Sequence, residues 1–128
     1  MSQIRVLVID DNADWRAYAE ILLYSKGITE IDTASTGLDG VRKAAALKPH
    51  LVVLDLGLTD VSGLEAARRI RSLSPQSRLL LVSAHEDPHV VDAAAAIVRC
   101  AFATKSRADY ELPLAVTLAL LDQLPPRH

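Results

Sequence analysis

The sequence contains little cysteine, few aromatic residues, no large charge excess and no long apolar run. Its one cysteine, Cys100, excludes a disulfide within the chain. A formal charge of -2 argues against a nucleic-acid surface on this segment, because binding the phosphate backbone requires clustered Lys and Arg. The apolar stretches are far shorter than the roughly 18 residues that cross a bilayer, so we expect no membrane segment.

The start of the chain, Met1–Arg5, lacks the basic segment and apolar run of a secretory signal. With the lone cysteine, this predicts a cytoplasmic protein. The length of 128 residues, half of them apolar, fits one domain with its own core. We expect that domain over residues 1–124, with residues 125–128 as a tail or the start of a linker.

Five short β-rich runs, each followed by a helical pattern, divide the chain. They are Ile4–Asp10, Glu30–Ala34, Leu51–Asp55, Arg78–Val82 and Cys100–Thr104. The first, third and fourth are apolar through their middle, as expected for central strands covered on both faces. The second and fifth are mixed in polarity, which predicts strands at the edges of the sheet.

The segments between these runs have helix signals. Thr36 and Ser62 each precede an acidic residue by three positions, a pattern typical of helix N-termini. Trp15, Tyr18 and Leu22 recur at helical spacing and predict the buried face of the first helix. Right-handed crossovers between parallel strands then predict an α/β fold, a (βα)5 flavodoxin-like doubly wound sheet of order 2-1-3-4-5 with helices on both faces.

In such sheets the functional site lies at the carboxyl ends of the strands. Five polar residues end the predicted strands: Asp10, Asp11, Asp55, Ser83 and Lys105. Three carboxylates brought together repel one another unless a cation joins them, and an open acidic cup with oxygen ligands suits Mg2+. A carboxylate can also attack a phosphoryl group if the negative charge is offset, here by the cation and Lys105, while the Ser83 hydroxyl donates to a phosphoryl oxygen.

Each of these residues has a simpler interpretation when taken alone. Asp10 and Asp11 could cap the first helix, and Asp55 could be an exposed loop carboxylate. Ser83 could be an ordinary strand-end hydroxyl, and Lys105 a surface lysine. Their placement at matching strand ends favours a shared site.

The same residues carry a family resemblance. The motifs are Val8-Ile9-Asp10-Asp11-Asn12, Asp55-Leu56-Gly57-Leu58 with Ser62-Gly63 beyond it, Val82-Ser83-Ala84, and Phe102 three residues before Lys105. From about Ile4 to about Leu124 the chain resembles the CheY-like receiver domain of bacterial response regulators in two-component signalling.

The resemblance implies a metal and phosphoacceptor site. It implies that Asp55 accepts the phosphoryl group and that Asp11 and Asp55 bind Mg2+ directly. Asp10 would act through water, and the backbone carbonyl of Gly57 would be a further ligand.

The resemblance also implies how the signal is received and passed on. The donor would be a phosphohistidine on a sensor histidine kinase. Lys105 and Ser83 would contact the phosphoryl group, and Ser83 and Phe102 would switch the face formed by the fourth helix, the fifth strand and the last helix. That face would control a partner or a C-terminal output domain outside this chain.

The sequence departs from the family pattern in three places. Thr59 replaces a Pro, which predicts altered stiffness of the loop after Asp55. Ser106 replaces a Pro whose preceding bond is cis in many relatives, so we expect a trans Lys105–Ser106 bond. Val98–Arg99 replaces a Gly-Ala pair, which disfavours a left-handed conformation at the end of the fourth helix.

The last helix, expected from about Asp109 to Leu124, is more apolar than one buried face requires. We expect Pro113 in its first turn, where proline is best tolerated. The surplus apolar surface predicts a homodimer or a docking surface, with the Ala-rich segment Ala93–Ala96 alongside.

Two other functions compete with a phosphorylated receiver. A pseudo-receiver would act by protein contact alone, but the complete set of acidic residues and Lys105 argues against it. A small aspartate-nucleophile phosphatase is the other, although Gly57 stands where such enzymes place a second Asp. We therefore expect catalysis only of the chain's own phosphorylation and dephosphorylation.

Overall fold

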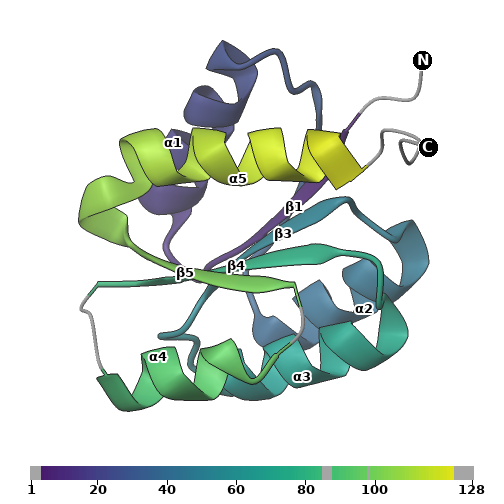
Figure 1. Ribbon diagram of the computed structural model, residues 1–128, viewed down its shortest axis with the longest axis vertical. Helices are drawn as coiled ribbons and strands as arrows, with labels where there is room; N and C mark the ends of the chain where they lie inside the picture. Colours follow the sequence, from purple (N-terminus) through teal and green to yellow (C-terminus); the bar gives the residue numbers. More distant parts are fainter. Residues whose placement is uncertain (1–3, 85–87, 98, 123–128) are drawn as a thin grey trace, which may run out of the picture.

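The computed structural model describes residues 4–84, 88–97 and 99–122 (Figure 1). Strands and helices alternate along the chain. The elements are β1 (Arg5–Ile9), α1 (Ala13–Ser25), β2 (Glu30–Ala34), α2 (Gly37–Leu47), β3 (Leu51–Asp55), α3 (Gly63–Leu73), β4 (Arg78–Ser83), α4 (Pro88–Ala95), β5 (Cys100–Thr104), the 3-10 helix η1 (Lys105–Arg107) and α5 (Ala108–Asp122).

All five strands are parallel and form one sheet in the order β2-β1-β3-β4-β5. Helices α1 and α5 cover one face, and α2, α3 and α4 cover the other (Figure 1). The predicted flavodoxin-like order, with β2 and β5 at the edges, is confirmed. Every strand begins and ends within one residue of its predicted bounds.

The core consists of two apolar layers, one on each face of the sheet. Alternate residues of β1 divide between them: Val6 and Val8 pack toward α1 and α5, whereas Leu7 and Ile9 pack toward α2 and α3. All residues of β3 are buried, which is why that run is apolar up to its final Asp55. The sequence pattern of the central strands thus follows from burial on both faces.

Polar caps begin the first three helices. Thr36 Oγ1 accepts from the Asp39 N–H at 3.1 Å, and Ser62 Oγ accepts from the Glu65 N–H at 3.1 Å, as the sequence predicts. At α1 the cap is Asn12, whose Oδ1 accepts from the backbone N–H of Trp15 at 3.0 Å. Asp10 and Asp11 therefore do not cap α1.

The predicted buried face of α1 is partly wrong. Ala19 and Leu23 are its buried residues, Trp15 and Leu22 are partly buried, and the Tyr18 side chain is 41% exposed. Ala19 and Leu23 belong to the core layer on this face of the sheet, and Trp15 and Leu22 pack against that layer.

Two backbone expectations near the carboxyl half are also wrong. Arg99 adopts φ 57°, the left-handed conformation that we expected the Val98–Arg99 pair to disfavour. Val98, which takes the place of the glycine, lies outside the described residues. Pro113 is the sixth residue of α5 and not in its first turn, because the helix begins at Ala108, directly after η1. The prediction of a trans Lys105–Ser106 bond is confirmed, since the described residues contain no cis peptide bond.

In the part of the chain that the structure describes, no helix combines the length and apolarity needed to cross a bilayer.

Candidate metal and phosphoacceptor site

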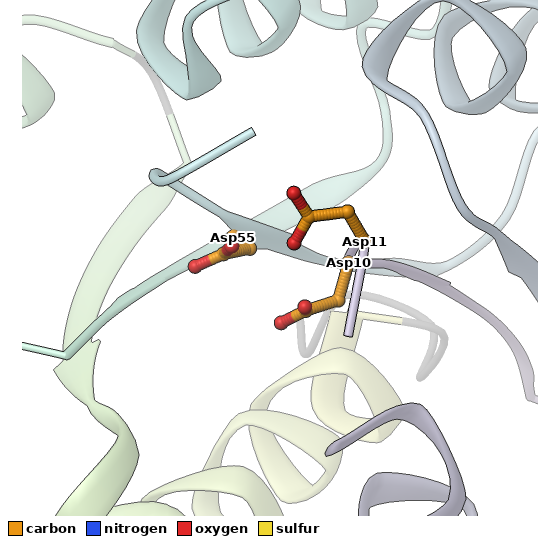
Figure 2. A group of neighbouring side chains, drawn as sticks. All are labelled: Asp10, Asp11 and Asp55. Atoms are coloured by element: carbon orange, nitrogen blue, oxygen red, sulfur yellow. The ribbon is translucent and has the colours of Figure 1, made fainter. Parts of the chain in front are cut away.

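Three carboxylates meet at the carboxyl edge of the sheet. Ile9 of β1 pairs with Leu54 of β3, so the next residues, Asp10 and Asp55, are neighbours across the two strands. Figure 2 shows the side chains of Asp10, Asp11 and Asp55 clustered together. One oxygen from each lies within 4.8 Å of the others; Asp10 and Asp55 are buried, and Asp11 is exposed.

Lys105, the first residue of η1 after β5, supplies a positive charge to this cluster. Its Nζ lies 3.0 Å from Asp10 Oδ2 and 3.8 Å from Asp55 Oδ1. The same ammonium lies 5.1 Å from the centroid of the Trp15 ring on α1, a cation–π distance. The ends of β1, β3 and β5 and the start of α1 therefore converge on one small site.

The charges of this site are not balanced by the protein. Burial raises the pKa of the Asp55 carboxyl, and the charge of Asp10 raises it further. Lys105 and the Gly57 backbone N–H, which hydrogen-bonds the carboxylate, lower the pKa of Asp55 without reversing the rise. An additional cation would stabilise the ionised form of Asp55.

The donor set fits Mg2+ better than a softer metal. The clustered ligand atoms are all carboxylate oxygens, and exposed Asp11 leaves the site open to water. Asp10 Oδ2 is buried and has no hydrogen-bond partner among the described residues, although Lys105 forms an ion pair with it. A buried oxygen with this unused acceptor capacity can orient a water or a cation.

Ser83 lies next to the acidic site, and Phe102 lies next to the core. Ser83 ends β4 directly after Val82, which pairs with Asp55. Phe102 of β5 pairs with Leu81 and packs, partly buried, against the apolar layer on the α2–α4 side. Both positions agree with the predicted geometry, while their roles remain predictions.

Two residues near the site, Asp60 and Arg16, form contacts that the sequence did not predict. The Asp60 carboxylate, five residues after Asp55, accepts the backbone N–H groups of Gly37 and Leu38, both at 2.9 Å. Arg16 Nη1 donates to the backbone carbonyl of Asp10 at 2.6 Å. The Asp60 contacts join positions 22 and 23 residues apart, so no local motif could have revealed them.

These features define an acidic site at the carboxyl edge of a doubly wound sheet, and comparison with known proteins gives the family. The family description "Response regulator receiver domain" matches residues 6–117. The chain therefore belongs to the response regulator receiver domain family of two-component signalling, as the sequence motifs predict.

Curated relatives contain this region as part of longer proteins. The chain is 38% identical over 80 residues to the protein-glutamate methylesterase/protein-glutamine glutaminase of Archaeoglobus fulgidus, covering 62% of this chain and 23% of that protein. It is 35% identical over 79 residues to the virulence-factor transcription regulator BvgA of Bordetella pertussis, covering 62% of this chain and 38% of that protein. The matched region thus spans well under half of either relative.

Solved structures have the same fold. The response regulator domain of CheB from Thermotoga maritima has 26% identity and a TM-score of 0.77, with 98% of this chain and 100% of that chain covered. A CheY-like receiver domain protein from Methanospirillum hungatei JF-1 has 21% identity and a TM-score of 0.87, with 95% and 97% covered. The second likeness concerns the fold alone.

Proposed function

We propose that this chain is a phosphorylated signalling switch that accepts a phosphoryl group on Asp55 from a phosphohistidine of a sensor histidine kinase. The observation that carries the proposal is the buried Asp55 carboxylate at the carboxyl edge of the sheet, clustered with Asp10 and Asp11 and 3.8 Å from the Lys105 ammonium. Carboxylates whose pKa is perturbed in this way are concentrated at functional sites in proteins.

In the proposed reaction an Asp55 carboxylate oxygen attacks phosphorus. The bond between phosphorus and the imidazole nitrogen breaks, and its electron pair stays on that nitrogen. Asp11, Asp55 and the Gly57 carbonyl are the proposed direct Mg2+ ligands, with Asp10 acting through water. Mg2+, when bound, offsets negative charge on the phosphoryl oxygens.

Lys105 is poised to change partners in this reaction. It now lies closer to Asp10 than to Asp55. A phosphoryl group on Asp55 would add negative charge within its reach and draw the ammonium from the Asp10 pair toward the new oxygens. We propose that Ser83 donates to the same group, and that Phe102 then repacks and alters the face of α4, β5 and α5.

The partners and context follow from the same proposal. A longer regulator, with the receiver spanning residues 1–124 and an output domain joined through a linker at 125–128, is one arrangement; a stand-alone receiver is the other. Residues 123–128 lie outside the described part of the chain. We propose a cytoplasmic location, since the phosphodonor kinase domain would have to reach Asp55.

The direct test is Mg2+-dependent modification of Asp55. We expect acetyl phosphate with Mg2+ to add one phosphoryl group by intact mass, and beryllofluoride with Mg2+ to change Trp15 fluorescence, because Lys105 lies against that ring. Asp55→Asn should abolish both responses, and omission of Mg2+ should do the same. The exposed-site variant Asp14→Asn, outside the cluster, is the matched control and should respond like the wild type.

The alternatives have distinct outcomes. Repeated turnover of the phosphodonor without a labelled protein would instead support a phosphatase. The complete absence of labelling and of any fluorescence change in the wild type would refute the phosphoacceptor proposal and favour a pseudo-receiver.

A further inference from the structure

One aromatic ring lies beside the acidic site. The Lys105 ammonium is placed over the Trp15 ring, 5.1 Å from the ring centroid. Trp15 is the chain's one tryptophan, and its side chain is partly buried. The separation is within the roughly 6 Å over which the negative face of an indole attracts a cation. The proposed phosphoryl transfer uses Lys105 but gives the ring no role.

The position of the ring is set by the first turn of α1 and by the core. Trp15 is the third residue of α1, and its backbone N–H donates to Oδ1 of the N-cap Asn12 at 3.0 Å. Its side chain packs against the apolar layer that contains Ala19 and Leu23. Because packing already restricts the rotamers of the indole, little side-chain entropy is lost when the ring contacts a cation.

Asp10 joins Lys105 to the same segment of the chain. Asp10 Oδ2 pairs with the Lys105 Nζ at 3.0 Å, while Asp10 Oδ1 accepts the Asn12 backbone N–H at 2.8 Å. Asn12 in turn caps the helix at Trp15. Asp10, Asn12, Trp15 and Lys105 therefore form a closed loop of contacts, and three of these residues lie between the end of β1 and the first turn of α1.

These contacts hold the ammonium on one side of the acidic site. The Lys105 Nζ lies 3.0 Å from Asp10 Oδ2 but 3.8 Å from Asp55 Oδ1, and the second distance is too long for a hydrogen bond. The Lys105 side chain is 25% exposed, so the ring and the carboxylates replace much of its water. The attraction to Trp15 thus stabilises a position of the ammonium that is nearer to Asp10 than to Asp55.

A phosphoryl group on Asp55 would compete with this position. It would add negative charge on the far side of Lys105 from the Asp10 pair. An interaction that is stronger in the resting state than in the phosphorylated state shifts the equilibrium toward the resting state by the difference in its free energy. The attraction between ring and ammonium is such an interaction, because it weakens as the ammonium leaves the face of the ring.

We propose that Trp15 is a positioning residue that holds Lys105 at Asp10 and thereby opposes the phosphorylated state. The ring takes no part in phosphoryl transfer and acts only through the lysine. This inference rests on the proposed phosphoacceptor function, because only a phosphoryl group on Asp55 gives Lys105 a second position.

The first measurement detects the contact in the resting protein. The full chain is labelled with 13C and kept in EDTA without a phosphodonor. Ring currents of the indole should move the Lys105 Cε and Hε signals upfield of those of the exposed Lys26. Trp15→Leu should remove this shift, whereas Tyr18→Leu, which removes a 41% exposed ring further along α1, should preserve it. Adding Mg2+ and beryllofluoride to the wild type should move the Lys105 signals back toward those of Lys26.

Fluorinated tryptophan separates the charge of the ring from its shape. Because the chain has one tryptophan, biosynthetic incorporation changes Trp15 alone and needs no variant that disturbs the core. Each added fluorine weakens the negative face of the ring while nearly preserving its size. We expect the affinity for beryllofluoride at saturating Mg2+, followed by amide NMR, to rise in steps from the unsubstituted to the trifluorinated ring, by about two- to fivefold in total. The affinity of Trp15→Phe should lie between those of the wild type and Trp15→Leu, because phenylalanine attracts a cation less strongly than tryptophan does.

Three results would overturn the proposal. They are a Lys105 signal in EDTA that matches that of Lys26, a Lys105 signal that stays upfield when beryllofluoride is bound, and an affinity that falls or stays constant across the fluorinated series. Failure of the phosphoacceptor function itself looks different. The wild type then shows no response to beryllofluoride with Mg2+, and the Lys105 shift in EDTA alone decides whether the ring holds the ammonium.

Discussion

At the scale of single residues, the environment of Asp55 disfavours the ionised form of its carboxyl group. It is buried beside Asp10, and Lys105 compensates only partly, so its pKa is raised. The folded protein therefore binds the Asp55 proton more tightly than the unfolded chain does. When the pH is above the folded-state pKa, Asp55 is ionised and its charge lowers the free energy of unfolding. When the pH is below the pKa in the unfolded chain, about 3.9, Asp55 is protonated in both states and this loss of stability is absent.

We predict that Asp55→Asn stabilises the Mg2+-free protein at pH 7. The expected gain in the free energy of unfolding is on the order of 1 kcal/mol, because a buried repelling charge is replaced by a neutral amide of similar shape. Urea unfolding in EDTA at pH 7 measures it. The gain should shrink toward the lowest pH at which both proteins fold, since wild-type Asp55 is then protonated.

Two comparisons check this account. Asp11→Asn, at the exposed member of the cluster, should have a smaller effect in EDTA. Saturating Mg2+ should remove the advantage of Asp55→Asn, because the cation stabilises the wild-type carboxylate. An Asp55→Asn protein less stable than the wild type in EDTA at pH 7 would contradict the electrostatic argument.

At the scale of elements, the loop after β3 is joined to a distant helix. Thr59 in place of Pro predicts a change in the stiffness of this loop, and its neighbour Asp60 supplies a constraint of another kind. The Asp60 carboxylate accepts the N–H groups of Gly37 and Leu38 at the start of α2, and these bonds lower its pKa. The loop that contains Gly57 is thereby fixed at its far end.

We predict that Asp60→Ala loosens both the loop and the start of α2. Amide hydrogen exchange of Gly37 and Leu38 should become faster, because the acceptor of both N–H groups is lost. Since the pKa of Asp60 is lowered, its stabilisation is present above the unfolded pKa and is lost as the pH falls through the folded value.

A matched variant separates this effect from general loss of stability. Ser62→Ala removes the N-cap of α3 and should speed exchange at Glu65 while leaving Gly37 and Leu38 unchanged. Unchanged protection of Gly37 and Leu38 in Asp60→Ala would show that other contacts fix this loop.

At the scale of the whole molecule, α5 has two apolar sides. Leu112, Ala115, Val116 and Ala119 are buried against the sheet. Leu114 and Leu121, seven residues apart on the other side, are 59% and 55% exposed. This agrees with the expectation of a surplus apolar surface, which we propose as the homodimer contact. Helix α4 lies on the opposite face of the sheet (Figure 1).

We predict that Mg2+ and beryllofluoride increase dimerisation and that Leu114→Glu keeps the chain monomeric. A charge placed in an apolar contact is costly to bury, so association should weaken by at least about tenfold. Sedimentation velocity across a concentration series measures it. Leu73→Glu, an equally polar change at an exposed leucine of α3, should dimerise like the wild type.

A wild-type protein that stays monomeric at all concentrations, with and without beryllofluoride, would exclude the dimer. Association of Leu114→Glu equal to that of the wild type would place the contact elsewhere.

The sequence by itself determined the sheet and the members of the acidic site. Strands buried on both faces must be apolar throughout, so Leu51–Leu54 marked the centre of the sheet and Asp55 its carboxyl edge. Parallel order then placed Asp10, Asp11 and Lys105 at the same edge. These inferences hold because they depend on local pattern and on topology.

Tertiary structure alone decided the features that depend on close approach between distant segments. Ala19 faces the sheet in place of Tyr18, and Asp60 caps a helix more than 20 residues away in sequence. The left-handed backbone of Arg99 opposes its local preference, and only packing at the amino edge brings it beside Arg5. The local sequence determines which backbone conformations are low in free energy. Contacts in the folded protein determine which unfavourable conformations are nevertheless adopted.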